Sequence, residues 1–179
     1  MGKKERFVAP IDGVLDSLSE EGILRIKKEI AGKEIKAPFG GRVDAASSGS
    51  VGLAFASAEM KGSWGSGNKA TGYLIVIEKE EGDLFSLDGT CEEQIVALPG
   101  ELTKGLWYKA ISLGAAGFIA GDLKSKPLLK EIEEDSEAVP VIILGIDGRI
   151  SQEFWAELKK AKGKMVLIDG QQKRVLIPH

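Results

Sequence analysis

Residues 9–15 read Ala-Pro-Ile-Asp-Gly-Val-Leu, and residues 37–43 read Ala-Pro-Phe-Gly-Gly-Arg-Val. Both stretches follow one pattern, Ala-Pro-x-x-Gly-x-(Val/Leu). Proline fixes φ and donates no backbone hydrogen bond, so each copy is expected at a strand edge or a corner. The glycine that follows permits a tight bend or a bulge. Two such corners in tandem predict a small β-structure built from two similar halves.

The chain around these corners has the rhythm of a β-domain. Short apolar stretches alternate with glycine-rich turns, and residues 73–77 form an apolar run typical of a strand buried on both faces. Residues 1–88 are therefore predicted to form an all-β sandwich or barrel. Residues 83–94 show no clear period, and they are predicted to cross between two domains.

From residue 95 the pattern changes to alternating strands and helices, which predicts a small α/β domain over 95–179 with a mostly parallel sheet. The overall fold class is thus α+β. Helices are expected over 103–113, from Pro127 and after the N-cap residue Ser151. Strands are expected over 95–98, 117–121, 139–144, 164–168 and 174–177.

Composition argues against several classes of function. The net charge of −3 gives no basic footprint for nucleic acid. No apolar run is long enough to cross a membrane, and the single cysteine, Cys91, is typical of the cytoplasm. The sole histidine is the last residue, His179, which argues against a catalytic triad and a zinc site. We therefore expect a cytoplasmic chain, favour a non-catalytic role over that of an enzyme, and predict no metal ligands.

Two segments resemble known modules. With its two Ala-Pro corners, the segment from residue 7 to about 80 resembles a barrel-sandwich hybrid, the fold of biotinyl and lipoyl carrier domains and of related non-carrier modules. Residues 108–121 contain a Leu-Gly-Ala-x-Gly step. They resemble the helix-to-strand step of swivelling β/α domains, including protease-associated ones. The combination is similar to a family of uncharacterised prokaryotic proteins that pair these modules, and the resemblance implies no known activity.

Lys61 is the candidate for a modified lysine. The resemblance implies biotin or lipoate on a lysine in an exposed hairpin turn of a carrier domain. Residues 58–62 read Ala-Glu-Met-Lys-Gly, which departs from the biotinyl pattern Ala-Met-Lys-Met. The second Ala-Pro corner also precedes Lys61, whereas in a carrier it would follow. An ordinary surface lysine is the alternative.

Residues 61–72 are the densest glycine stretch of the chain. Their spacing is not that of a phosphate-binding P-loop, and a strand rather than a helix is expected after them. They are predicted to be either a flexible hairpin connection or a binding loop with Trp64 as its exposed anchor. The residues of this binding loop are Lys61, Gly62, Trp64, Gly65, Gly67 and Lys69.

Acidic residues follow three predicted strands of the α/β segment. Ligands of such domains bind beyond the carboxyl ends of the strands. Glu101, Asp122 and Asp147 are therefore a possible rim for a cation or a hydroxylated ligand. Ordinary turn chemistry is the alternative, because Asp-Gly and Gly-Asp are common turn sequences.

Three hypotheses remain open from the sequence. The first is a non-catalytic binding or assembly module that contacts a protein partner, or another copy of itself, through the Trp64 loop. The second is a carrier protein modified on Lys61. The third is a small-ligand or metal-binding domain, or an enzyme, that uses the acidic strand ends.

Overall fold

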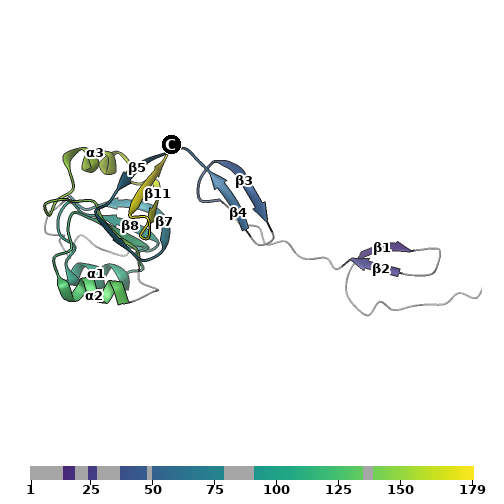
Figure 1. Ribbon diagram of the computed structural model, residues 1–179, viewed down its shortest axis with the longest axis horizontal. Coiled ribbons are helices and arrows are strands. Elements are labelled where there is room, and N and C mark those ends of the chain that lie inside the picture. Colours follow the sequence, from purple (N-terminus) through teal and green to yellow (C-terminus); the bar gives the residue numbers. More distant parts are fainter. Residues whose placement is uncertain (1–13, 19–23, 28–36, 48–49, 79–90, 135–138) are drawn as a thin grey trace, which may run out of the picture. The chain divides into compact units, whose positions relative to one another are not determined.

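The computed structural model describes residues 14–18, 24–27, 37–47, 50–78, 91–134 and 139–179 (Figure 1). The chain forms two compact units, Met1–Lys36 and Ala37–His179. The described helices are α1 (Lys104–Ser112), α2 (Lys126–Glu134) and α3 (Gln152–Lys160). The described strands are β1 (Val14–Leu18), β2 (Leu24–Lys27), β3 (Arg42–Ser47), β4 (Ser50–Ala54), β5 (Ser57–Lys61), β6 (Trp64–Ser66), β7 (Lys69–Val76), β8 (Gln94–Ala97), β9 (Gly117–Ala120), β10 (Val141–Ile143), β11 (Met165–Asp169) and β12 (Arg174–Pro178).

Each Ala-Pro copy is followed by an antiparallel hairpin, β1–β2 after the first and β3–β4 after the second. Both β1 and β3 begin at the residue after the glycine of the motif. The pairing register also shifts at the same place in each hairpin, between Leu15 and Ser17 in β1 and between Val43 and Ala45 in β3. The repeated sequence therefore builds a repeated local geometry, with an irregularity in strand pairing shortly after the glycine of each copy.

The other eight strands form one mixed sheet in the order β5-β12-β11-β7-β8-β9-β10-β6. The four central strands β7, β8, β9 and β10 are parallel, and every pairing outside them is antiparallel. The prediction of a mixed α and β fold is confirmed. The sheet is less parallel than expected, because antiparallel strands extend the parallel centre on both sides.

One short segment closes this sheet. The strands at its two edges, β5 and β6, are consecutive in the sequence and are separated only by Gly62 and Ser63. The Gly62 N–H donates to the carbonyl of Lys173, beside β12, at 2.6 Å. The Ser63 N–H donates to the carbonyl of Ile143, in β10, at 2.8 Å. The chain thus passes directly from one edge of the sheet to the other, and this continuous segment closes the sheet by joining its two edge strands, each of which pairs with one neighbouring strand.

The eight-stranded sheet contains strands from both of the predicted domains. Residues 1–88 and 95–179 were expected as separate domains, yet β5 pairs with β12 and β7 pairs with both β8 and β11. The boundary between the two compact units falls instead between Lys36 and Ala37 in the sequence. The difference arises because pairing partners far apart in sequence leave no local signal in the residues that pair.

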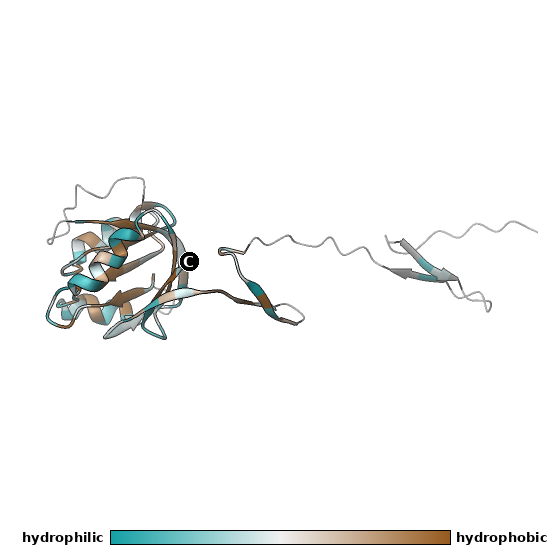
Figure 2. Ribbon diagram, turned by 90° about the horizontal axis from the view of Figure 1, so that it is seen from above, coloured by the Kyte–Doolittle hydropathy of each residue, from teal (hydrophilic) through white to brown (hydrophobic). Residues whose placement is uncertain are grey.

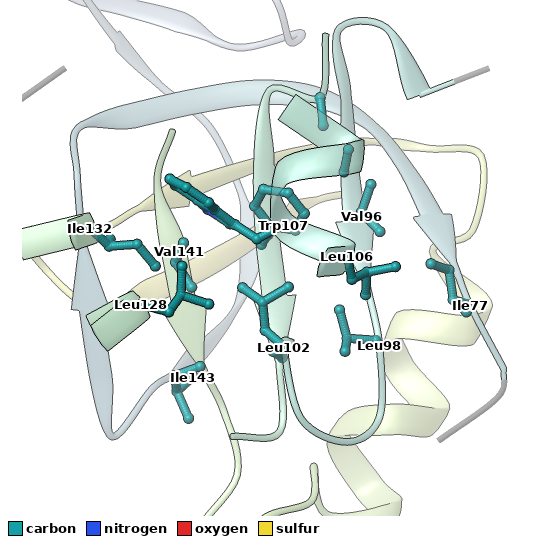
Figure 3. Close-up of a cluster of buried hydrophobic side chains, with 14 of the residues drawn as sticks. Ile77, Val96, Leu98, Leu102, Leu106, Trp107, Leu128, Ile132, Val141 and Ile143 are labelled. Atoms are coloured by element: carbon teal, nitrogen blue, oxygen red, sulfur yellow. The ribbon is translucent and has the colours of Figure 1, made fainter. Parts of the chain in front are cut away.

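Two apolar cores lie on opposite faces of the parallel strands, and alternate side chains of each strand enter different cores. The first core lies between the sheet and helices α1 and α2, and it includes Leu106 and Trp107 of α1, Leu128 of α2 and Val141 of β10 (Figure 3). The second core lies inside the closed sheet and includes Leu158 of α3. Figure 1 shows α3 on the other side of the strands from α1 and α2, and Figure 2 shows hydrophobic residues concentrated along the strands.

The helices begin where the sequence predicts. The Thr103 hydroxyl accepts a hydrogen bond from the Leu106 N–H, and the Ser151 hydroxyl accepts one from the Phe154 N–H, as N-caps do. The helix predicted at Pro127 begins one residue earlier, at Lys126.

Surface contacts connect α1 to α2. The Tyr108 hydroxyl donates a hydrogen bond to Oε1 of Glu131, and the Lys104 ammonium lies 3.3 Å from Oε2 of the same carboxylate. The hydrogen bond from Tyr108, followed by that from Lys104, lowers the pKa of Glu131 below its ordinary value. The bond to Glu131 raises the pKa of Tyr108 and of Lys104. These contacts hold α2, which carries one wall of the pocket described below.

The substitution Gly170→Ala tests how closely β6 approaches the turn between β11 and β12. A methyl group on Gly170 would overlap the carbonyl oxygen of Ser66 in β6. We expect Gly170→Ala to lower the free energy of unfolding by about 2–3 kcal/mol. Gly163→Ala is the control, because Gly163 has a φ of +76° but no atom within 4 Å of an added methyl group. It should cost only about 1 kcal/mol. Urea denaturation measures both, and equal losses would contradict the close approach at Gly170.

The contact between α1 and α2 predicts a pH effect. Tyr108→Phe removes the donor to Glu131, so the pKa of Glu131 should rise toward its ordinary value. In the native chain, the stabilisation from Glu131 is present above its ordinary pKa and is lost as the pH falls through its lowered folded-state pKa. Carbon-13 NMR titration of the Glu131 carboxyl measures the shift. Tyr73→Phe, at an exposed tyrosine of β7, should leave that titration unchanged, and an unchanged titration in Tyr108→Phe would contradict the assignment.

Candidate functional site

A pocket of about 260 Å³ lies at the carboxyl ends of β9 and β10. Ligands of parallel sheets bind at such strand ends. We call it the strand-end pocket, and it is lined by Ser63, Trp64, Gly121, Asp122, Leu123, Leu129, Ile143, Gly145 and Ile146. Two of the sites proposed from the sequence, the Trp64 segment and the acidic strand ends, therefore contribute residues to the same pocket.

The closure of the sheet builds one wall of the pocket. In the pairing of β6 with β10, Trp64 lies opposite Ile143. The Ser63 hydroxyl donates to the carbonyl oxygens of Gly145, at 3.0 Å, and of Ile143, at 3.3 Å. A side chain of β6 is thereby held against the end of β10 by backbone pairing and by a hydroxyl group.

The floor of the pocket depends on two glycines. A Cβ on Gly145 would overlap the carbonyl oxygen of Gly121, so the ends of β9 and β10 approach more closely than a side chain would allow. Gly121 also donates its N–H to the carbonyl of Gly100, at 2.8 Å, which extends the pairing toward the end of β8. The strand ends are therefore joined by close backbone contacts.

Asp122 supplies the charge of the pocket. About a quarter of its side chain is exposed (26%), and Oδ2 lies 3.6 Å from the Nζ of Lys124. Oδ1 accepts a hydrogen bond from the Leu123 N–H at 2.7 Å, which fixes the orientation of the carboxylate. Among the described residues that line the pocket, Asp122 is the only charged one. The pocket therefore presents a single oriented negative charge.

The prediction for Trp64 needs correction. The sequence predicted either a flexible hairpin connection or a binding loop with Trp64 as its exposed anchor, but Trp64 lies in β6, is half-buried and packs against the first apolar core. Its exposed part lines the strand-end pocket. The segment was taken for a loop because of its glycines, whereas Gly65 is in a strand whose backbone passes close to Gly170. Close packing, and not flexibility, requires this glycine.

The other residues of the predicted binding loop are dispersed. Lys61 ends β5, Gly62 makes the crossing to β6, and Gly67 is in the turn before β7, with a φ of +81°. Lys69 begins β7, and its ammonium lies 3.5 Å from Oδ2 of Asp169, a carboxylate that is fully buried. Lys69 thus neutralises a structural carboxylate, as does Arg174, whose Nη2 lies 3.8 Å from the same oxygen.

Lys61 is exposed, but its surroundings differ from those that the carrier resemblance implied. The resemblance placed it in a hairpin turn, whereas β5 pairs with β12 and β6 pairs with β10. Lys61 therefore precedes a crossing between two sheet edges. Its modification by biotin or lipoate stays a prediction.

The acidic strand ends converge only in part. Glu101 and Asp122 lie opposite each other in a parallel bridge beyond β8 and β9. Asp147 is exposed in the turn after β10, and it does not line the pocket. Within the part of the chain that the structure describes, no three His, Cys, Asp or Glu side chains are grouped to hold a metal ion.

Sequence analysis missed the apolar part of the pocket. Leu123 and Ile146 follow strand ends, and Leu129 lies on α2. Ile146 is 91% exposed, which is unusual for so large an apolar residue. Its place in a Gly-Ile-Asp-Gly turn after an apolar strand was a usable signal.

A second cavity, of about 480 Å³, lies at the other ends of the parallel strands, between Tyr73, Gln94 and Ala116. It contains none of the site residues predicted from the sequence.

No protein-family model, curated protein or solved structure matches the chain. Among the described residues, no helix combines the length and the apolar character needed to cross a lipid bilayer. Inferences about the strand-end pocket therefore rest on its own geometry and chemistry.

The corrected place of Trp64 gives a stability prediction. Trp64→Ala should lower the free energy of unfolding by about 2 kcal/mol, less than for a fully buried tryptophan, because its ring packs partly against the first core. Ile146→Ala also changes a lining residue of the pocket, but at an exposed site. It should stay within about 0.5 kcal/mol of the native chain. Thermal or urea unfolding compares the two, and an equally stable Trp64→Ala variant would contradict the packing of this ring.

Proposed function

We propose that this chain is a non-catalytic binding module that captures a protein partner at the strand-end pocket. The observation that carries the proposal is the meeting of Trp64 and Asp122 in one pocket, although they are far apart in the sequence and only β10 lies between their strands, β6 and β9, in the sheet. Tryptophan is among the residues that contribute most to protein interfaces. Ile146 is an exposed apolar group that a partner would cover.

The chemistry of the pocket favours binding over catalysis. General acid–base or nucleophilic catalysis needs two or more reactive side chains within hydrogen-bond reach. Among the described lining residues, the reactive types are Asp122 and Ser63. The Ser63 hydroxyl donates to backbone carbonyls of β10 and Gly145, and no hydrogen bond joins it to Asp122. Both residues thus have structural partners, and neither activates the other.

The size of the pocket supports a partner's side chain as the occupant. Pockets for drug-sized ligands usually measure roughly 300–1,000 Å³, and this one measures about 260 Å³. A single side chain that projects from a protein surface is a better match than a nucleotide cofactor.

We also propose a cytoplasmic location for the chain and a relation to two known kinds of domain. A cytoplasmic location is favoured because the only cysteine, Cys91, has no second cysteine with which to form a disulfide within the chain. A relation to swivelling domains is supported by the parallel strands β7 to β10, with α1 and α2 against one face. A relation to barrel-sandwich modules is supported by the two hairpins that follow the Ala-Pro copies.

Two substitutions test the proposal. Asp122→Asn and Trp64→Phe should each weaken partner binding by about tenfold or more, which is the usual loss at a central interface residue. Asp147→Asn is the control, because it removes the same charge from a nearby turn that does not line the pocket. The partner is captured by crosslinking on the native chain, identified by mass, purified, and titrated against all four proteins by calorimetry. A partner that binds Asp122→Asn and Trp64→Phe as tightly as the native chain would overturn the proposal.

A further inference from the structure

We propose that the group captured in the strand-end pocket is a cationic side chain, a lysine or an arginine that projects from the partner protein. This inference rests on the proposed binding function and specifies the chemistry of the bound group. The pocket combines one carboxylate, one indole and aliphatic walls. A long cationic side chain has a part that matches each of them.

The charge of the pocket selects a cation. The Asp122 carboxylate is the single charge among the described lining residues. The carbonyl oxygens of Ile143 and Gly145 also lie at this edge, where they accept hydrogen bonds from Ser63. An anion placed here would meet these oxygens and would lose hydration without gaining a counter-ion. A cation instead gains a charge-assisted hydrogen bond to Asp122.

The walls of the pocket select a long side chain. Tryptophan binds cations over its ring more strongly than the other aromatic residues do. Leu123, Leu129 and Ile143 are lining residues that offer apolar surface to the methylene groups of lysine or arginine. A simple metal ion would leave this apolar surface uncovered.

Within the chain itself, Lys124 already forms an ion pair with Asp122. Its ammonium lies 3.6 Å from Oδ2 of Asp122, yet its own side chain is 68% exposed. Such an exposed ion pair contributes little free energy, so a partner's cation that also contacts Trp64 can displace it. Lys124 therefore occupies the carboxylate in the free chain and competes with the partner. Removal of the Lys124 charge is therefore expected to tighten the binding of a partner's cation, because Lys124 no longer competes for the Asp122 carboxylate.

The test uses small probes and the nitrogen-15-labelled full chain. The probes are N-acetyl-arginine methylamide and N-acetyl-lysine methylamide, with the citrulline and norleucine analogues as neutral controls, all at one ionic strength. The readouts are the NMR signals of the Trp64 indole N–H and of the Asp122 and Gly145 amides. We expect one or both cationic probes to shift these three signals in a saturable way. The neutral analogues should bind about tenfold more weakly.

Four variants sharpen the test. Asp122→Asn should weaken the cationic probes about tenfold, whereas Asp147→Asn should change them less than twofold. Lys124→Ala should tighten them about threefold, and Lys126→Ala, which removes an equal charge from the exposed start of α2, should not. The same spectra report whether each variant is folded. A response of arginine but not lysine would assign a guanidinium, and the converse an ammonium.

Three outcomes would overturn the inference. If the neutral analogues bind as tightly as the cationic probes, the pocket binds side chains without charge selection, and the binding function itself stands. If no probe shifts the three signals, or if Lys124→Ala weakens the cationic probes, the cationic assignment fails. The capture experiment with Asp122→Asn and Trp64→Phe then decides the binding function separately, because it does not depend on the probes.

Discussion

The closure of the sheet by residues 57–66 is the constraint on which the rest of the structure depends. The edge strands of an open sheet are separate segments that expose unpaired N–H and C=O groups. One continuous segment instead supplies both edge strands, and only Gly62 and Ser63 lie between them. This segment turns an open sheet into a container for the second apolar core, in which Met60 of β5 packs with Ile168 and Val175.

Closure also explains the distribution of glycine. The crossing brings β6 so close to the turn at Gly170 that a Cβ on Gly65 would lie 2.7 Å from the Gly170 carbonyl oxygen. Residues that appear flexible in the sequence are in fact tightly packed. The buried carboxylate of Asp169, which ends β11 just before this turn, accepts the Gln172 N–H and faces the cations Lys69 and Arg174. The turn is thus held by charge as well as by packing.

The sequence predicted local structure well and long-range structure poorly. The strands and helices from residue 95 onward follow from apolar periodicity and from the caps at Thr103 and Ser151, which are interactions between neighbours in the chain. The assignment of β5, β6 and β7 to the same sheet depends on pairing with strands that are distant in the sequence, such as Trp64 with Ile143 and Ala58 with Ile177. Asp122 was found from its place after a strand, but its meeting with Trp64 depends on the pairing of β6 with β10, which no local pattern encodes.

Trp64 joins the stability of the fold to the proposed function. The same indole packs against the first core and lines the strand-end pocket, and it belongs to the segment that closes the sheet. A group bound between Trp64 and Asp122 contacts the closing segment on one side and the ends of β9 and β10 on the other. Its binding free energy therefore adds to the free energy of closure, and by linkage a weaker closure weakens binding. A site of this kind responds to the integrity of the whole barrel, although it is lined by few residues.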